Sequence, residues 1–115
     1  MNAEHAESVT DEFELVCALE ELPKGEPALA VINGVRVAMV LDVEGVVHAV
    51  NDTCSHANVS LSEGEVDGCT IECWLHGSRF DLNTGVPTGP PATVPIAVYP
   101  VRIKDGDVYV AVPAS

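Results

Sequence analysis

Short apolar runs separated by turn signals fill most of this chain. The run 28–32 leads into Asn33-Gly34, a dipeptide that strongly favours a two-residue hairpin turn. The run 35–43 follows with few polar breaks, as expected for a strand covered on both faces. Further strands are predicted at 46–50, 70–73, 80–82, 96–104 and 108–112, with a short strand possible within 12–22. No helical periodicity of useful length is present.

The last two runs show the alternation expected of a half-buried hairpin. They flank the turn Asp105-Gly106, and Val108, Val110 and Val112 fall on one face of the second arm. Together with the other strands, this pattern predicts an all-β fold of antiparallel strands, arranged as sheets or a sandwich.

Composition supports one domain over residues 1–115, since apolar residues make up 47% of the chain. The segment 1–11 is polar and acidic, which predicts a flexible tail and not a secretory signal. No stretch approaches the ~20 apolar residues that a membrane helix needs. A cytoplasmic protein without a membrane anchor is therefore expected.

The charge balance restricts the possible partners. Five basic residues against eighteen acidic ones give a formal net charge of −13. Such a surface repels phosphate backbones and anionic lipids, so neither nucleic acid nor a membrane is an expected partner. A protein with a basic docking face would be attracted. Acidity that only keeps the protein in solution is the other interpretation.

The candidate chemistry lies in two short motifs, Cys54-Ser55-His56 and Cys73-Trp74-Leu75-His76. Each motif places a thiolate and an imidazole at near-contact spacing. A Rieske [2Fe–2S] cluster requires two cysteines on one iron and two histidines on the other. Because neutral imidazoles replace two thiolates, such a cluster has a potential of about −150 to +300 mV. The motifs predict a one-electron carrier, with residues 51–92 as a loop-built lobe that holds the cluster.

Two other metal sites are conceivable. Zinc also binds two cysteines with two histidines, and a zinc-stabilised binding module is the alternative from another class of function. Structural zinc sites, however, typically pair Cys with Cys and His with His, and the alternating order here fits that poorly. A cluster held by all four cysteines would add Cys17 and Cys69 and leave both histidines idle.

The stretch from Asn51 to Pro91 resembles the cluster-binding part of the Rieske family, and nearly the whole chain resembles its small ferredoxins. Besides the two ligand motifs, the matching segments are Leu61-Ser62-Glu63-Gly64, Gly77-Ser78-Arg79-Phe80-Asp81, Thr84-Gly85 and Thr88-Gly89-Pro90-Pro91-Ala92. The resemblance implies the Rieske iron–sulfur fold, with Cys54, His56, Cys73 and His76 as ligands of one [2Fe–2S] cluster. The proline-rich segment corresponds to a third loop over that cluster.

Departures from the respiratory members of the family bear on the potential. Those proteins carry two further cysteines where this chain has Val59 and Leu75, and a tyrosine where it has Phe80. Ser78 stands where the resemblance places a hydroxyl that donates to a bridging sulfide. Fewer hydrogen bonds to sulfur lower the potential, so a value in the lower part of the Rieske window is expected.

The function that the resemblance implies is that of the ferredoxin component of bacterial ring-hydroxylating dioxygenase systems. It would take electrons from a flavin-dependent reductase and deliver them to the terminal non-haem iron oxygenase. The small subunit of a nitrite reductase and a ferredoxin of iron–sulfur assembly are alternatives. Once the cluster takes two histidines, His5 and His48 are too few to hold a mononuclear iron as well, so no enzymatic activity is expected.

The remaining candidates have less defined roles. Cys17 is expected to fill core, Cys69 to lie in a strand, and His5 and His48 to be structural or solvated. An apolar rim for partner docking is the functional interpretation of three further residues, Trp74, Leu75 and Pro90. Packing beneath the second ligand loop is the alternative for Trp74.

Overall fold

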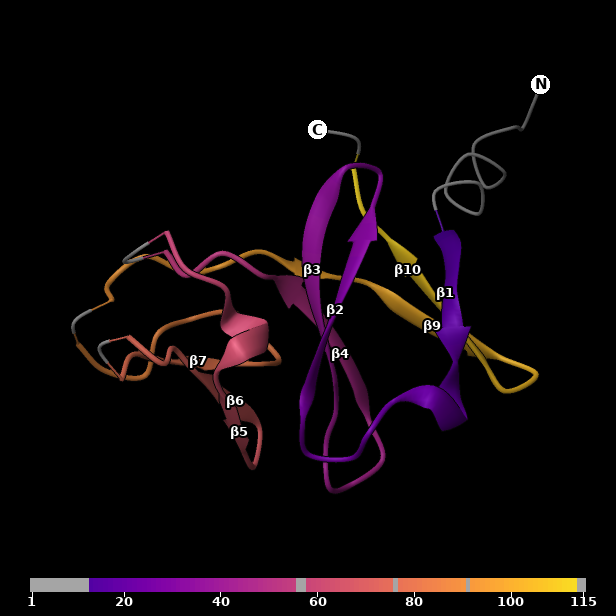
Figure 1. Cartoon of the computed structure of the whole chain (residues 1–115), viewed down its shortest axis with the longest axis horizontal. Helices are drawn as coiled ribbons and strands as arrows, with labels where there is room; N and C mark the ends of the chain where they lie inside the picture. Colours follow the sequence, from indigo (N-terminus) through magenta and orange to yellow (C-terminus); the bar gives the residue numbers. More distant parts are fainter. Residues whose placement is uncertain (1–12, 56–57, 76, 91, 114–115) are drawn as a thin grey trace.

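The computed structural model describes residues 13–55, 58–75, 77–90 and 92–113. The predicted tail 1–11 lies outside these residues. Within them the strands form three antiparallel sheets, and the helical segments are single 3₁₀ turns, η1 (Leu19–Glu21) and η2 (Leu61–Glu63). The all-β prediction is confirmed. Figure 1 shows one sheet at the centre, a second beside it, and a small third sheet on the opposite side.

The central sheet has the order β2 (Pro27–Ile32), β3 (Val35–Leu41), β4 (Val47–Asn51), β8 (Val98–Tyr99). Its first hairpin turns at Asn33 and Gly34, with φ of 54° and 80°, as a type I′ turn requires. The consecutive β3 residues 37–40 are all buried, which confirms a strand covered on both faces. The described residues form two hydrophobic cores, one on each face of this sheet.

The second sheet has the order β1 (Phe13–Ala18), β10 (Asp107–Ala111), β9 (Val101–Lys104). Val108, Val110 and Val112 are buried against Val37 and Met39 of β3, so the predicted face is confirmed. The two sheets thus enclose one core between them. Cys17 packs at the edge of this core, as expected for a small apolar side chain.

One predicted strand is wrong, because the run 96–104 is split in two. Its first part contributes β8 to the central sheet, and its second part forms β9 in the other sheet. Pro100 stands between them and has no N–H to continue a ladder. Its carbonyl accepts the N–H of Ala111 (3.1 Å), so the chain changes sheets at the proline.

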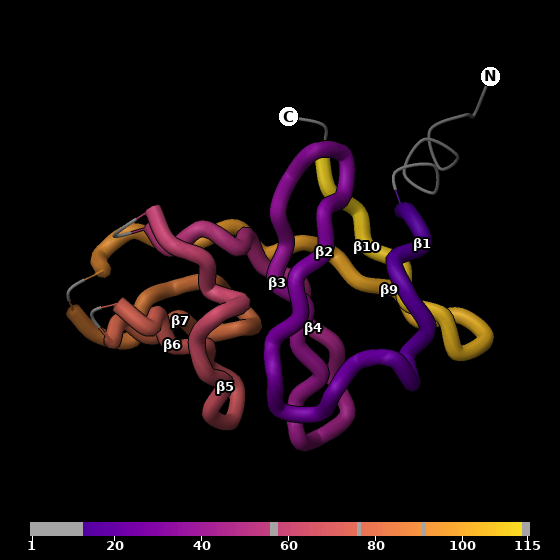
Figure 2. Tube along the Cα trace, viewed as in Figure 1, coloured from indigo at the N-terminus to yellow at the C-terminus, as the bar shows by residue number. Residues whose placement is uncertain are grey.

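The third sheet, β5 (Glu65–Asp67), β6 (Thr70–Glu72), β7 (Arg79–Asp81), lies within 51–92. Figure 2 shows the chain leaving β4 for this region and returning through β8. A second core joins it to the central sheet, with Ile71, Phe80 and Leu82 on one side and Ala38, Val40 and Val50 on the other. The sequence did not predict β5. The side chains of its three residues are exposed, half-buried and exposed in turn, so the strand has no apolar run that would mark it.

Candidate metal centre

The two cysteines of the ligand motifs both belong to the second core. Cys54 follows β4 and Cys73 follows β6, and both are almost fully buried in a cluster that includes Leu61, Phe80 and Ala92. Two segments that are distant in sequence thus bring both thiols into one apolar environment. His56 and His76, the other two predicted ligands, lie outside the described residues.

The second ligand loop is a tight turn closed by backbone hydrogen bonds. The N–H of Cys73 donates to the carbonyl of Ser78 (2.7 Å), and the N–H of Gly77 donates to the carbonyl of Cys73 (3.0 Å). Gly77 has a φ of 78°, a conformation that glycine adopts without strain. The turn fixes the Cys73 backbone at the end of β6.

The first ligand loop is closed in a similar way. The N–H of Cys54 donates to the carbonyl of Val59 (3.0 Å), and Thr53 forms an isolated antiparallel bridge with Ser60. Just before it, Asp52 is fully buried and accepts the N–H of Ser62 (2.7 Å). Both cysteines therefore sit where a paired segment ends and a closed loop begins.

Ser78 shows the polarity that a cluster needs. Its side chain is fully buried, and its Oγ accepts the N–H of Ala92 (3.1 Å). None of the described residues accepts the hydroxyl proton of Ser78. A buried donor without an acceptor costs free energy, and a sulfide of a cluster between the loops would accept it. Two buried thiols and this hydroxyl fit a [2Fe–2S] group.

The proline-rich segment and the residues that flank it contact the first ligand loop and β7. The Oγ of Ser55 donates to the carbonyl of Val94, and the N–H of Thr88 donates to the carbonyl of Arg79 (2.8 Å). Pro87 forms an isolated bridge with Phe80. This arrangement agrees with the third loop that the resemblance implied.

The apolar side chains beside the cysteines face solvent. Trp74 is 51% exposed and Leu75 is 40% exposed, and Pro90 is exposed as well. Trp74 is therefore only partly covered by its neighbours, Glu63, Gly64, Glu65 and Glu72 among them. The three residues agree with an apolar rim.

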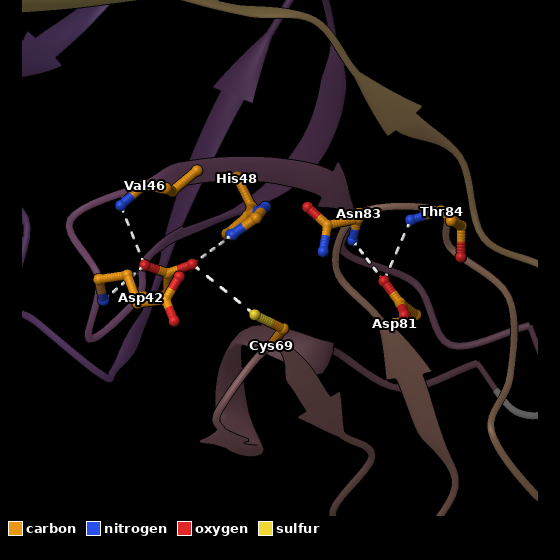
Figure 3. A network of polar contacts seen from close by, with 8 residues as sticks. Asp42, Val46, His48, Cys69, Asp81, Asn83 and Thr84 are labelled. Carbon is orange, nitrogen blue, oxygen red and sulfur yellow. Dashed lines mark hydrogen bonds and ion pairs between the residues drawn. The ribbon is translucent and has the colours of Figure 1, made fainter.

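A buried, hydrogen-bonded pair of polar side chains, Asp42 and His48, lies where the second core meets the turn before β6 (Figure 3). His48 Nε2 is 2.8 Å from Asp42 Oδ2, and Asp42 Oδ1 accepts the N–H groups of Glu44 and Val46, both at 2.9 Å. The hydrogen bond from His48, with those from the backbone, lowers the pKa of Asp42. His48 is therefore structural, as expected.

Cys69 reaches the same carboxylate from the third sheet. Cys69 is exposed, and its Sγ lies 3.9 Å from Asp42 Oδ2. Partial desolvation of the sulfur at this contact and the negative charge of Asp42 raise the pKa of the thiol. The prediction that Cys69 lies in a strand is wrong, because it ends the turn after Asp67 and Gly68. Burial raises the pKa of the Cys17 thiol as well, with a further contribution from Glu21.

Comparisons with known proteins agree with this site. The Rieske [2Fe-2S] domain family matches residues 12–100. The chain is 42% identical to "Ferredoxin CarAc" of Metapseudomonas resinovorans over 96 residues, covering 84% of this chain and 90% of that protein. It is 41% identical to the "3-phenylpropionate/cinnamic acid dioxygenase ferredoxin subunit" of Escherichia coli (strain K12) over 100 residues, covering 86% and 92%.

A solved structure shares the fold. It is a complex of reduced oxygenase and oxidised ferredoxin in carbazole 1,9a-dioxygenase, with a TM-score of 0.79 and 40% identity over 86% of this chain and 92% of that one. The chain therefore belongs to the Rieske [2Fe-2S] domain family, and its cofactor is one [2Fe–2S] cluster. Like the relatives named as ferredoxins, it is an electron carrier and not an enzyme. Within the described residues, no helix is long and apolar enough to cross a membrane.

Proposed function

We propose that Cys54 and Cys73 hold one iron of the cluster and that His56 and His76 hold the other. The observation that carries this assignment is the burial of the two thiols in one core, each at the start of a closed loop. When bound, the cluster accepts and releases one electron. The buried apolar residues around the two thiols would shield the cluster from water, and the Ser78 hydroxyl would donate a hydrogen bond to a sulfide.

In this proposal, the chain accepts electrons from a flavin-dependent ferredoxin reductase and delivers them to the terminal oxygenase of an aromatic-ring dioxygenase system. Two relatives support this proposal. One is the 3-phenylpropionate/cinnamic acid dioxygenase ferredoxin subunit, and the other is the ferredoxin in the complex with the oxygenase of carbazole 1,9a-dioxygenase. The rim of Trp74, Leu75 and Pro90 supplies an exposed apolar surface beside the ligand loops for docking. A cytoplasmic location is part of the proposal, since that compartment keeps ligand thiols reduced.

Cysteine variants test the ligand assignment, because the chain supplies its own controls. We expect Cys54→Ser and Cys73→Ser to lose the visible absorption and the EPR signal of the reduced cluster. Cys17→Ser and Cys69→Ser should keep both, with about two irons per chain. Loss of the cluster in a control variant, or about one zinc and no iron in the unaltered protein, would overturn the assignment.

Electron delivery is tested with the reduced protein and the oxygenase of carbazole 1,9a-dioxygenase as the acceptor. Reoxidation of the reduced cluster should follow the oxygenase concentration, and a Trp74→Ala variant should slow it without changing the cluster spectrum. A protein with an intact cluster that reduces no oxygenase of this class would refute the proposed delivery. A separate assay with NADH and a flavin reductase tests the supply of electrons.

A further inference from the structure

A buried carboxylate lies two residues before Cys54. Asp52 has no exposed surface, and its Oδ1 accepts the N–H of Ser62 (2.7 Å), while its Oδ2 accepts the hydroxyl of Ser60. Its backbone carbonyl accepts the N–H of Leu61 (2.6 Å). One residue therefore ties the start of the first ligand loop to three consecutive residues at its end.

The carboxylate of Asp52 faces a single cation among the described residues. Arg36 Nη2 is 3.4 Å from Asp52 Oδ2 and 3.3 Å from Ser60 Oγ, and the N–H of Asp52 donates to the carbonyl of Arg36 (3.0 Å). The arginine side chain is 54% exposed, whereas that of the aspartate is fully buried. Solvent therefore screens the positive charge more than the negative one.

This asymmetry bears on the potential of the cluster. The Cα atoms of residues 52 and 54 are at most about 7 Å apart, because two residues span no more. A negative charge close to the redox centre opposes an added electron, and a positive charge favours it. Reduction by one electron, supplied by the reductase, would turn a diferric cluster into a ferric–ferrous one. The charges of Asp52 and Arg36 would change the free energy of this reduction.

We propose that Asp52 is a positioning residue of the first ligand loop whose charge lowers the reduction potential, and that Arg36 partly offsets it. The inference rests on the proposed ligand role of Cys54. It makes the ion pair below the loop a determinant of potential separate from hydrogen bonds to the cluster sulfurs. The hydrogen bonds of Asp52 fix the loop, and its charge sets the electrostatic environment in which the electron arrives.

Two substitutions that break the same ion pair distinguish this role from a structural one. Asp52→Asn keeps the size of the side chain and removes the negative charge, so the midpoint potential should rise. Arg36→Gln removes the positive charge and leaves the carboxylate uncompensated, so the potential should fall. A charge on the order of 10 Å away at an effective dielectric of about 20 changes the equilibrium constant of reduction about tenfold, or ~59 mV for one electron. The arginine effect should be smaller and should weaken with added salt.

Matched control variants make the same changes of net charge in the second sheet, on the side of the central sheet opposite to the third sheet (Figure 1). Asp107→Asn in β10 and Arg102→Gln in β9 should leave the midpoint potential where it is. Potentials are measured by mediated redox titration of the holoprotein, followed by visible absorption and EPR. Iron content and thermal unfolding are measured for each variant.

The outcomes separate this inference from the proposed function. If the unaltered protein shows a Rieske signal, but both variants shift the potential in the same direction or not at all, the electrostatic role is wrong. If Asp52→Asn does not fold, Arg36→Gln alone decides, because its side chain is half exposed. A potential of Arg36→Gln at or above that of the unaltered protein would overturn the proposal. A protein without any cluster signal would refute the proposed function instead.

Discussion

Ser78 is the side chain whose contribution to the potential can be isolated most directly. Its buried Oγ accepts the N–H of Ala92, and we propose that its own proton goes to a cluster sulfide. We expect Ser78→Ala to lower the reduction potential, because a hydrogen bond of about 1 kcal/mol to the reduced state is lost, or ~40 mV for one electron. Thr70→Ala, whose hydroxyl donates to the carbonyl of Asp67, is the control and should leave the potential unchanged. A redox titration that gives equal potentials for Ser78→Ala and the unaltered protein would contradict the role.

Cys69 offers a second test at this scale. Partial desolvation and the carboxylate of Asp42 raise the pKa of its thiol, so little thiolate forms near neutral pH. We expect Asp42→Asn to lower this pKa and to speed alkylation of Cys69 by iodoacetamide several-fold at pH 8. The measurement follows modification by mass spectrometry in a Cys17→Ser background. An alkylation rate that Asp42→Asn leaves unchanged would show that the carboxylate does not control the thiol.

Some of these residues could be found from the sequence and others could not. Cys54, Cys73 and Ser78 are marked by motif spacing and resemblance, because ligand chemistry restricts which residues can serve. Asp42 and His48 are marked by no motif. Their contact follows from the short connection between the strands predicted at 35–43 and 46–50, which brings two adjacent strand ends together. Burial of the pair depends on packing against the third sheet.

At the level of elements, the turn between η2 and β5 depends on a close approach of two backbones. A Cβ atom on Gly64 would lie 1.8 Å from the carbonyl oxygen of Glu72. We expect Gly64→Ala to destabilise the protein by about 1–3 kcal/mol, because one of the two segments must shift. Gly89→Ala is the control, since a Cβ atom there would meet none of the described atoms within 4 Å. The stability of both variants is measured by thermal unfolding, followed by absorption of the cluster. Equal unfolding midpoints for Gly64→Ala and Gly89→Ala would refute the steric clash at Gly64.

Strands whose own sequence contains an apolar run bounded by turn residues were predicted well. The exceptions have physical causes. β2, β3 and β10 are specified by apolar periodicity and turn dipeptides, both of which are local. β5 has a single half-buried residue, so its strand character comes from pairing with β6 and not from its own sequence. The change of sheet at Pro100 is visible in the sequence as a missing donor, although the destination of the chain is not.

At the scale of the whole molecule, the buried Asp42–His48 pair makes acid stability depend on the contact between the central sheet and the turn before β6. The pKa of Asp42 is lowered on folding, so the folded state holds its carboxylate charged where the unfolded chain would bind a proton. Its contribution to stability is therefore present above the ordinary pKa of 3.8 and is lost as pH falls through the lower folded value. The unaltered protein should be more stable than Asp42→Asn near neutral pH. We expect this difference in unfolding free energy to shrink as the pH falls below about 3.8. Urea unfolding between pH 6 and pH 3 measures it, and a constant difference would contradict the linkage.

The charge of the molecule, −13 in total, should govern how fast it meets a basic partner. Glu63 and Glu65 line a cavity of about 230 Å³ with Trp74, next to the second ligand loop. We expect the association rate with an oxygenase to fall as salt rises, because screening acts over about 8 Å at physiological ionic strength. If local charge steers the encounter, Glu63→Gln with Glu65→Gln should slow association at low salt more than Glu14→Gln with Glu20→Gln, which lie on the far sheet and its adjoining turn. Equal slowing by the two pairs would assign steering to net charge alone, and a rate independent of salt would exclude steering altogether.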